Sequence, residues 1–308
     1  MPILEVENLS VSFKQYKAGF KQIHNQVISS LNITLEAGRI LAVVGASGSG
    51  KSLLAHAILG ILPSNARTSG TIKYEGEILT PARQKALRGK EIAIVPQSVS
   101  FLDPLMRVGK QVRTSVRGSE DATAVQRKVF ERYHLRKEAE TQYPFQLSGG
   151  MARRVLLSTA MVSGAKVIIA DEPTPGLDPV VMKEALQNIR EFADNGSAVM
   201  FITHDIESAL QIADKIAVFY AGTTVEIAPV ANFTNQGEAL RHPYTKALWR
   251  ALPQNDFIPI PGSQPQLSEL PTGCLFAPRC PIAATECFEK QPEMRELRGG
   301  LVRCIHEN

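Results

Sequence analysis

A glycine-rich segment at residues 45–52, Gly-Ala-Ser-Gly-Ser-Gly-Lys-Ser, has the residue types and spacing that bind phosphate groups. Glycine permits positive φ, so several backbone N–H groups can turn toward one anion. An apolar run at 40–44 precedes the segment, and an apolar helical pattern at 53–59 follows it. We therefore predict a strand, a phosphate-binding loop and a helix whose N-terminal dipole also attracts the anion. This context predicts a nucleotide-binding α/β protein.

The side chains of this loop have distinct expected roles. Lys51 would place a positive charge beside the β- and γ-phosphates of a nucleotide. The hydroxyl of Ser52 suits the oxygen shell of Mg²⁺. The other residues of the loop predicted to bind the nucleotide are Gly45, Ser47, Gly48, Ser49 and Gly50.

Two acidic residues and a histidine follow buried-strand patterns. Asp171 and Glu172 come directly after the apolar run 167–170, and His204 follows the run 198–202. We expect all three at the carboxyl edge of a parallel sheet, where open α/β sheets bind ligands. An Asp in that position suits Mg²⁺, and the acid that follows it can orient an attacking water.

A second candidate anion site lies at residues 147–151, Leu-Ser-Gly-Gly-Met, just before a helical stretch at 152–162. The Ser148 hydroxyl and the N–H groups of Gly149 and Gly150 would stand at the N-terminus of that helix. An ordinary helix cap has the same residues, so both interpretations stay open.

The composition is that of a soluble globular protein, with 44% hydrophobic and 21% charged residues in 308. A net charge of +4, spread along the chain, gives little support for a nucleic-acid partner. The first residues lack the pattern of a signal peptide, and no apolar run reaches the roughly 18 to 20 residues that span a bilayer. We expect a cytosolic chain whose membrane role, if any, depends on partners.

Strand and helix patterns alternate over most of the chain. Polar and apolar residues alternate at 3–13 and 27–35, which predicts an antiparallel edge sheet with a loop at 14–26 between its strands. Helix formers dominate 98–160, which predicts a helical subdomain inserted between core strands. Further elements are expected as strands at 71–76, 92–95, 167–170, 198–202 and 215–220 and as helices at 123–134, 182–193 and 207–213.

Together these motifs resemble the ATP-binding subunit of an ABC transporter. The resemblance implies a P-loop NTPase fold with a parallel core sheet, an antiparallel edge sheet and a helical subdomain. It also implies ATP hydrolysis at a dimer interface, with the signature loop of each subunit facing the nucleotide of the other. The motifs it identifies, in family order, are the Walker A loop at 45–52, the Q-loop at Gln97, the signature at 147–151, the Walker B acids Asp171 and Glu172, the D-loop at 175–178 and the switch histidine His204.

The same resemblance assigns roles to individual residues. Catalytic roles fall to Glu172, His204, Gln97 and Lys51, and Mg²⁺ would be held by Ser52, Gln97 and Asp171. Two departures from the family pattern stand out: Met151 replaces the usual Gln of the signature, and Gly176 replaces a common Ala of the D-loop. For the aromatic residue that stacks on adenine we choose Phe13, with Tyr16 as the alternative.

Past Pro253 the chain is proline-rich, and we expect a small, separate, loop-rich tail with little core of its own. All the cysteines lie in this tail, at Cys274, Cys280, Cys287 and Cys304. In a cytosolic chain such clustering favours a metal over disulfides. From spacing alone, structural Zn²⁺ and an iron–sulfur cluster fit about equally. Four unrelated buried thiols remain a third interpretation, because cysteine packs as a small hydrophobe.

Residues 241–248 and this tail resemble the C-terminal extension of oligopeptide, dipeptide and nickel importer ATPases. The resemblance implies a [4Fe-4S] cluster on the four cysteines and two parts, an ABC ATP-binding domain at 1–255 and the extension at 256–308. It also implies a peripheral place on the cytoplasmic face of the membrane. The implied cargo is peptide, with nickel or a metal chelate as the alternative and a non-transport ABC ATPase less favoured. The implied partners are a second ATP-binding subunit, identical or different, two transmembrane permease subunits and an extracytoplasmic substrate-binding protein.

Overall fold

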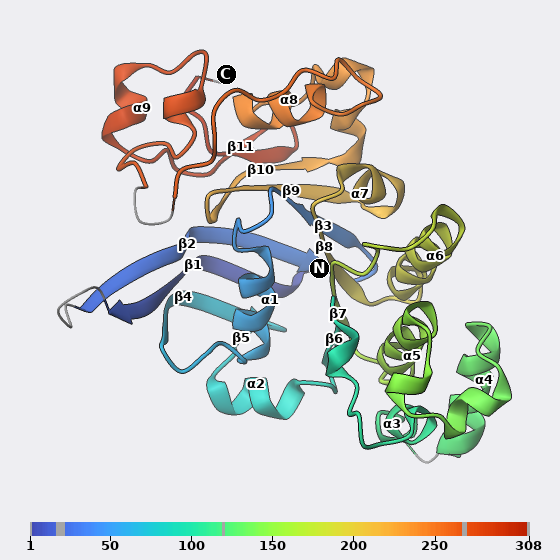
Figure 1. The fold of residues 1–308 in the computed structure, drawn as a ribbon. Coiled ribbons are helices and arrows are strands. Elements are labelled where there is room, and N and C mark those ends of the chain that lie inside the picture. Colours follow the sequence, from blue (N-terminus) through green and yellow to red (C-terminus); the bar gives the residue numbers. More distant parts are fainter. Residues whose placement is uncertain (1, 17–21, 119–120, 267–269, 307–308) are drawn as a thin grey trace.

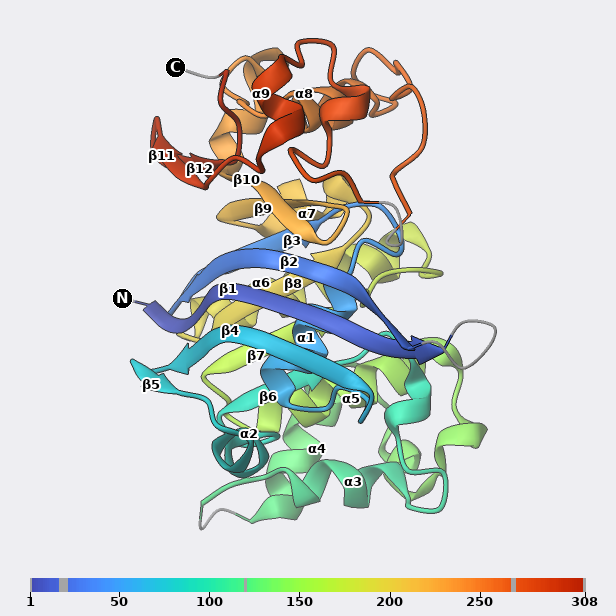
Figure 2. The same cartoon turned by 90° about the vertical axis from the view of Figure 1, so that its left-hand side faces the viewer.

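Two sheets and the helices around them make up the fold in this computed structural model, which describes residues 2–16, 22–118, 121–266 and 270–306. The larger sheet has the order β11-β12-β10-β9-β3-β8-β7-β6, and the smaller has the order β2-β1-β4-β5. Figure 1 shows the smaller sheet and α1 on one side of the larger sheet, with α5, α6 and α7 on the other. Figure 2 shows the smaller sheet face-on.

The centre of the larger sheet is parallel and covered on both faces. Its strands are β3 (Ile40–Val44), β6 (Ile92–Val95), β7 (Val167–Asp171), β8 (Ala198–Thr203) and β9 (Lys215–Tyr220). Every residue of β3, β7 and β8 is buried. Alternate side chains therefore enter two apolar clusters, one beneath the helices and one shared with the smaller sheet and α1. The predicted strand positions are confirmed, and those of β6 and β9 agree to the residue.

The helices follow the expected order along the chain. They are α1 (Lys51–Leu59), α2 (Pro81–Leu87), α3 (Val108–Thr114), α4 (Ala122–Arg132), α5 (Gly149–Val162), α6 (Pro179–Asp194) and α7 (Ile206–Ile212). The carboxylate of Asp121 accepts a hydrogen bond from the Thr123 N–H (2.9 Å) and so fixes the start of α4. That helix ends before the expected 134, because His134 has φ 51°. Helices α3, α4 and α5 pack against one another and form the predicted helical insertion between β6 and β7.

The first two strands of the smaller sheet are longer than their sequence patterns indicate. It contains β1 (Pro2–Tyr16), β2 (Gln22–Glu36), β4 (Ala66–Tyr74) and β5 (Glu77–Ile78). The prediction of a loop at 14–26 is wrong at both ends, because Lys14 pairs with His24 in the antiparallel ladder. Backbone pairing continues there without an apolar face, and residues 17–21 lie outside the described part of the chain.

The C-terminal tail is joined to the larger sheet. The elements that follow β9 are β10 (Thr223–Pro229), α8 (Pro243–Arg250), α9 (Thr285–Glu289), β11 (Arg295–Leu297) and β12 (Gly300–Val302), of which α9, β11 and β12 lie in the tail. The sequence patterns singled out none of them. Val302 pairs with Glu226 across the antiparallel β10·β12 ladder. Leu275 and Phe276 belong to the larger apolar cluster. We expected a separate tail with little core, and the structure differs in this respect, while a domain boundary after residue 255 stays a prediction. Among the residues described, none of the helices has the length and apolar character that crossing a bilayer requires.

A buried histidine at the start of α8 makes the stability of this fold depend on pH. His242 is 1% exposed, and its Nδ1 accepts a hydrogen bond from the Tyr244 N–H (3.1 Å). Burial, followed by the positive charges of Arg303 and Lys246, lowers the pKa of His242 to about 3. In the unfolded chain the pKa of a histidine is about 6.5, so acid favours unfolding between these two values.

We predict that the free energy of unfolding falls as the pH drops below about 6.5, with His242 contributing about 1.4 kcal/mol per pH unit. His242→Asn keeps an acceptor for the Tyr244 N–H and should remove this contribution. Urea unfolding at pH 5 and pH 7 measures the difference, and the exposed His24, changed to Asn, is the control. If the free energy of unfolding fell by the same amount between pH 7 and pH 5 in wild type and in His242→Asn, the prediction would be wrong.

Candidate functional site

The glycine-rich loop connects β3 to α1 and touches the end of β9. Gly48 and Gly50 have φ of 76° and 100°, which favour glycine over other residues. A Cβ on Gly45 would lie 2.6 Å from the backbone oxygen of Phe219. The close approach to β9 therefore requires glycine at position 45, and the positive φ angles favour glycine at positions 48 and 50.

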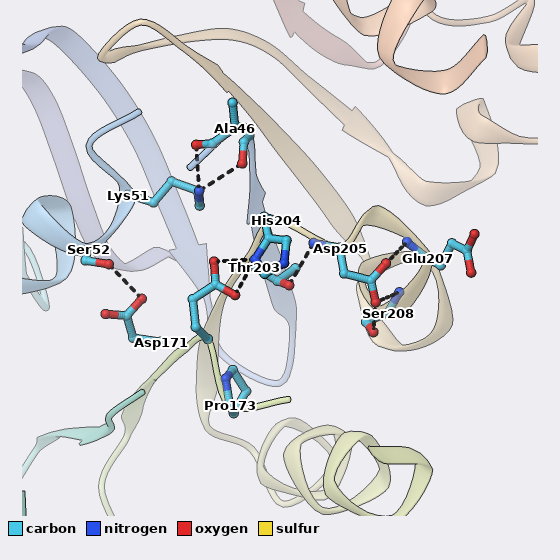
Figure 3. A network of polar contacts seen from close by, with 12 residues as sticks. Ala46, Lys51, Ser52, Asp171, Pro173, Thr203, His204, Asp205, Glu207 and Ser208 are labelled. Carbon is cyan, nitrogen blue, oxygen red and sulfur yellow. Dashed lines mark hydrogen bonds and ion pairs between the residues drawn. The ribbon is translucent and has the colours of Figure 1, made fainter. Parts of the chain in front are cut away.

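Lys51 is the buried positive charge of the loop. Its Nζ donates hydrogen bonds to the backbone oxygens of Gly45 (2.8 Å) and Ala46 (3.0 Å), and the residue is 5% exposed (Figure 3). Burial lowers the pKa of Lys51, while the carboxylates of Glu172 and Asp171 oppose that effect. A buried ammonium held against the loop could pair with a phosphate group.

An oxygen pair lies beside the loop, where α1 meets the end of β7. The Ser52 hydroxyl donates a hydrogen bond to Oδ1 of Asp171 at 3.1 Å (Figure 3). Burial raises the pKa of Asp171, and the hydrogen bond from Ser52 acts in the opposite direction. A hydroxyl and a carboxylate are hard oxygen ligands, so this pair could enter the coordination shell of Mg²⁺.

Glu172 and His204 meet because β7 and β8 are parallel neighbours. Nδ1 of His204 lies 2.9 and 3.0 Å from the two carboxylate oxygens of Glu172. An ionised carboxylate only accepts hydrogen bonds, so this pairing requires a hydrogen on Nδ1. Glu172 has φ 47°, is 8% exposed and donates its N–H to the Ile202 oxygen (2.9 Å). A held carboxylate of this kind could orient a water molecule and accept its proton.

Neighbouring groups keep His204 at the edge of the sheet. The N–H of Asp205 donates a hydrogen bond to the Thr203 hydroxyl at 3.0 Å. The Asp205 carboxylate caps α7 by accepting from the Glu207 and Ser208 N–H groups (3.0 and 3.3 Å; Figure 3). We did not single out this cap from the sequence, although an Asp before a helical pattern is the signal that predicts one.

Gln97 lies at the sheet edge of the site, whereas Phe13 belongs to the smaller sheet. Gln97 is exposed and follows β6, whose Val95 pairs with Ala170 of β7, so it lies at the same sheet edge as Asp171. Phe13 on β1 is half-buried against the cluster that contains α1. The side chain of Tyr16 lies outside the described residues.

The signature-like segment caps its own helix. The Ser148 hydroxyl accepts a hydrogen bond from the Met151 N–H (3.3 Å), and open space surrounds Gly149 and Gly150 where a Cβ would point. Within the described part of the chain, no hydrogen bond joins Ser148 to the glycine-rich loop. Arg153 on α5, which we did not predict, donates to the Pro173 oxygen (3.1 Å) and connects this helix to the segment after Glu172.

The four cysteines of the tail form no disulfides and lie near one another. Cys287 and Cys304 are buried, and Cys274 and Cys280 are half-buried. Burial raises the pKa of Cys274, and the neighbouring Cys287 and Cys304 thiolates add to the increase. No three Cys, His, Asp or Glu side chains in the described ranges gather closely enough to hold a metal ion.

Comparison with known proteins decides the family. Residues 28–175 match the ABC transporter family, and residues 225–287 match the oligopeptide/dipeptide transporter C-terminal region. The oligopeptide transport ATP-binding protein OppD of Salmonella typhimurium is 36% identical, across 98% of this chain and 93% of its own. This chain belongs to the ABC transporter family of ATP-binding proteins. The OppD protein of Bacillus subtilis is 34% identical, across 95% of this chain and 85% of its own.

A solved structure confirms the fold. The ATP-binding cassette MJ0796, in a dimeric post-hydrolysis state bound to ADP and phosphate, aligns with a TM-score of 0.63 and 23% identity. The alignment covers 74% of this chain and 99% of that one. The predicted ABC-type P-loop NTPase fold, with its mixed sheets and helical part, is therefore confirmed, and the chain is an ABC ATPase.

We predict that Asp171 makes Mg²⁺ binding sensitive to acid. Its raised pKa keeps the carboxyl protonated at a higher pH than an ordinary aspartate, and Mg²⁺ requires the ionised form. Titrating Mg²⁺ into the ADP-bound protein between pH 5 and pH 8 should show that the advantage of wild type over Asp171→Asn shrinks as the pH falls. Protonation of the nucleotide affects wild type and Asp171→Asn equally, so the difference between them isolates the contribution of Asp171. An advantage that stays constant over this range would contradict the prediction.

Proposed function

We propose that this chain is the ATP-hydrolysing subunit of an importer of oligopeptides or dipeptides. The Glu172–His204 pairing, next to Lys51 and the Ser52–Asp171 pair, is the observation that carries the catalytic part of the proposal. We infer the cargo from the relatives, which are named oligopeptide transport ATP-binding proteins. The match of residues 225–287 to the oligopeptide/dipeptide transporter C-terminal region also supports it.

Within the site, Lys51 and the backbone of residues 45–52 bind the phosphates of ATP. Ser52, Asp171 and Gln97 would hold Mg²⁺, and the bound ion would supply positive charge for the phosphates. Glu172 orients the attacking water and accepts its proton, and His204 holds the Glu172 carboxylate in place. For the aromatic residue that stacks on the adenine ring we propose Phe13, with Tyr16 as the alternative.

A second ATP-binding subunit completes the site. In this chain the exposed Ser148 and Gly149 and the half-buried Gly150 begin α5, with open space where a Cβ on either glycine would point. We propose that this turn faces the nucleotide bound to the other subunit, where its N–H groups and the helix dipole stabilise the phosphates. Either an identical or a different subunit could supply the other half.

Exposed apolar side chains support a membrane partner. Phe101, Leu105 and Phe145 are 56%, 88% and 75% exposed. Such exposure is costly in water unless a partner covers it, and two of these residues follow closely after Gln97. We propose that two permease subunits dock on the surface that begins at Gln97 and hold the chain on the cytoplasmic face of the membrane. A substrate-binding protein on the other side would deliver the cargo.

We further propose that the four cysteines hold a [4Fe-4S] cluster, with structural Zn²⁺ as the alternative. The thiols are free of disulfides, half-buried or buried, and within electrostatic range of one another. A single Zn²⁺ needs all four sulfur atoms about 2.3 Å from one point. A cluster carries several iron atoms between the thiolates and so accepts a wider arrangement of sulfur atoms than a single ion does.

We predict that Glu172→Gln binds ATP about as tightly as wild type but hydrolyses it at least a hundredfold more slowly, because a neutral amide cannot accept the proton of the water. ATPase assays and nucleotide binding on the purified protein measure this. Uptake of labelled dipeptide and of labelled nickel in cells then identifies the cargo. Undiminished hydrolysis would overturn the catalytic assignment, and selective loss of nickel uptake would move the cargo from peptide to metal.

We predict that anaerobically purified protein contains iron and acid-labile sulfide in equal amounts, about four of each per chain. Cys280→Ser and Cys287→Ser should each lower both values, while the control Ser263→Ala, in the same tail, should leave them unchanged. Stoichiometric zinc without sulfide would establish the alternative metal. Protein that contains neither metal would show that the cysteines only pack as small hydrophobic side chains.

A further inference from the structure

Arg279 links the cysteine segment to the backbone of the proline-rich tail. Its Nε donates a hydrogen bond to the Pro261 oxygen (2.7 Å), and its Nη2 donates to the oxygens of Ile260 (3.2 Å) and Gly262 (3.0 Å). Its Nη1 donates to the Tyr220 hydroxyl (3.2 Å). One planar guanidinium thus fastens residues 260–262 to the last residue of β9.

Tyr220 is fixed within the core. It is 1% exposed, and its ring lies 4.5 Å from the Tyr244 ring and 5.3 Å from the Phe276 ring, centroid to centroid. The preceding residue, Phe219, contributes the backbone oxygen that requires glycine at position 45. A short path of packed groups therefore runs from Arg279 to the phosphate-binding loop.

The fastened segment borders a cavity that opens on the ATP site. This cavity of about 310 Å³ is lined by Gly45, Ala46 and His204 on one side and by Tyr220, Ile260 and Arg279 on the other. The His204 side chain is 56% exposed and lines this cavity, so the width of the cavity determines how much room its other rotamers have. Ile260 and Arg279 of this wall belong to the tail, and the roles assigned to the ATPase motifs include none of its three residues.

We propose that Arg279 is a positioning residue for ATP hydrolysis, acting through His204. By holding residues 260–262 against Tyr220, it keeps the cavity narrow and favours the His204 rotamer that pairs with Glu172. Without that support, His204 populates other rotamers and Glu172 loses its orienting partner. Lys51 and Ser52 lie on α1 and keep their own contacts, so nucleotide binding is not affected. The inference rests on the proposed function, because it assigns a support to the same catalytic pair.

The test compares conservative variants in the full-length chain. Arg279→Lys keeps the positive charge, but an ammonium cannot bridge three carbonyls and a hydroxyl as a guanidinium fork does. We expect kcat for ATP hydrolysis, counted per nucleotide-binding chain, to fall about fivefold. The Kd for ATP should stay within about twofold of the wild-type value. Arg250→Lys is the matched control, since Arg250 lies on α8, pairs with Asp256 and does not line the cavity.

A double variant separates positioning from general destabilisation. In a His204→Ala background, Arg279→Lys should cause no further loss of kcat, because the group through which it acts is absent. An additional fivefold loss in that background, or an unchanged kcat in Arg279→Lys alone, would overturn the inference. So would a loss of the overall ATPase rate that disappears once the rate is divided by the concentration of nucleotide-binding chains. If wild-type protein shows no hydrolysis that depends on Glu172, the proposed function fails instead, and the two failures are thereby distinguishable.

Discussion

The parallel pairing of β7 with β8 determines which charged groups meet at the ATP site. Asp171 pairs with Ile202, and the N–H of Glu172 continues the ladder by donating to the Ile202 oxygen. This register brings Glu172 beside His204 and leaves Asp171 directed to Ser52. A slip of one residue would turn every side chain of the strand to the opposite face, so the apolar residues before Asp171 hold the register that the chemistry needs.

Burial of opposite charges explains why this arrangement is both costly and useful. Lys51, Asp171 and Glu172 are each less than a tenth exposed. Removing such groups from water is unfavourable unless they are paired, and a low local dielectric strengthens every interaction that remains. The two apolar clusters on either face of the larger sheet offset that cost. The site therefore depends on a core that tolerates no displacement of its central strands.

Sequence patterns predicted the parts of the molecule in which local rules are strict. The phosphate-binding loop needs particular residues at each position, and fully buried strands such as β8 need continuous apolar runs. Long-range pairings left no such local pattern. The extension of β1 through Lys14 and the pairing of β12 with β10 depend on partners distant in sequence. The four hydrogen bonds of Arg279 likewise could not be predicted, because the sequence of the tail indicates only a proline-rich loop.

The pairing of β12 with β10 also affects how the chain behaves toward other chains. Val302 pairs with Glu226, and the Arg303 N–H donates to the Val225 oxygen (2.8 Å), so the tail covers what would otherwise be the edge of the larger sheet. Uncovered edge strands are templates for pairing with strands of other molecules. Proteolytic loss of the last residues would therefore leave β10 as an unpaired edge strand beside buried apolar side chains. With the tail in place the three-residue β11 is the edge strand instead, and an edge this short offers little for another strand to pair with.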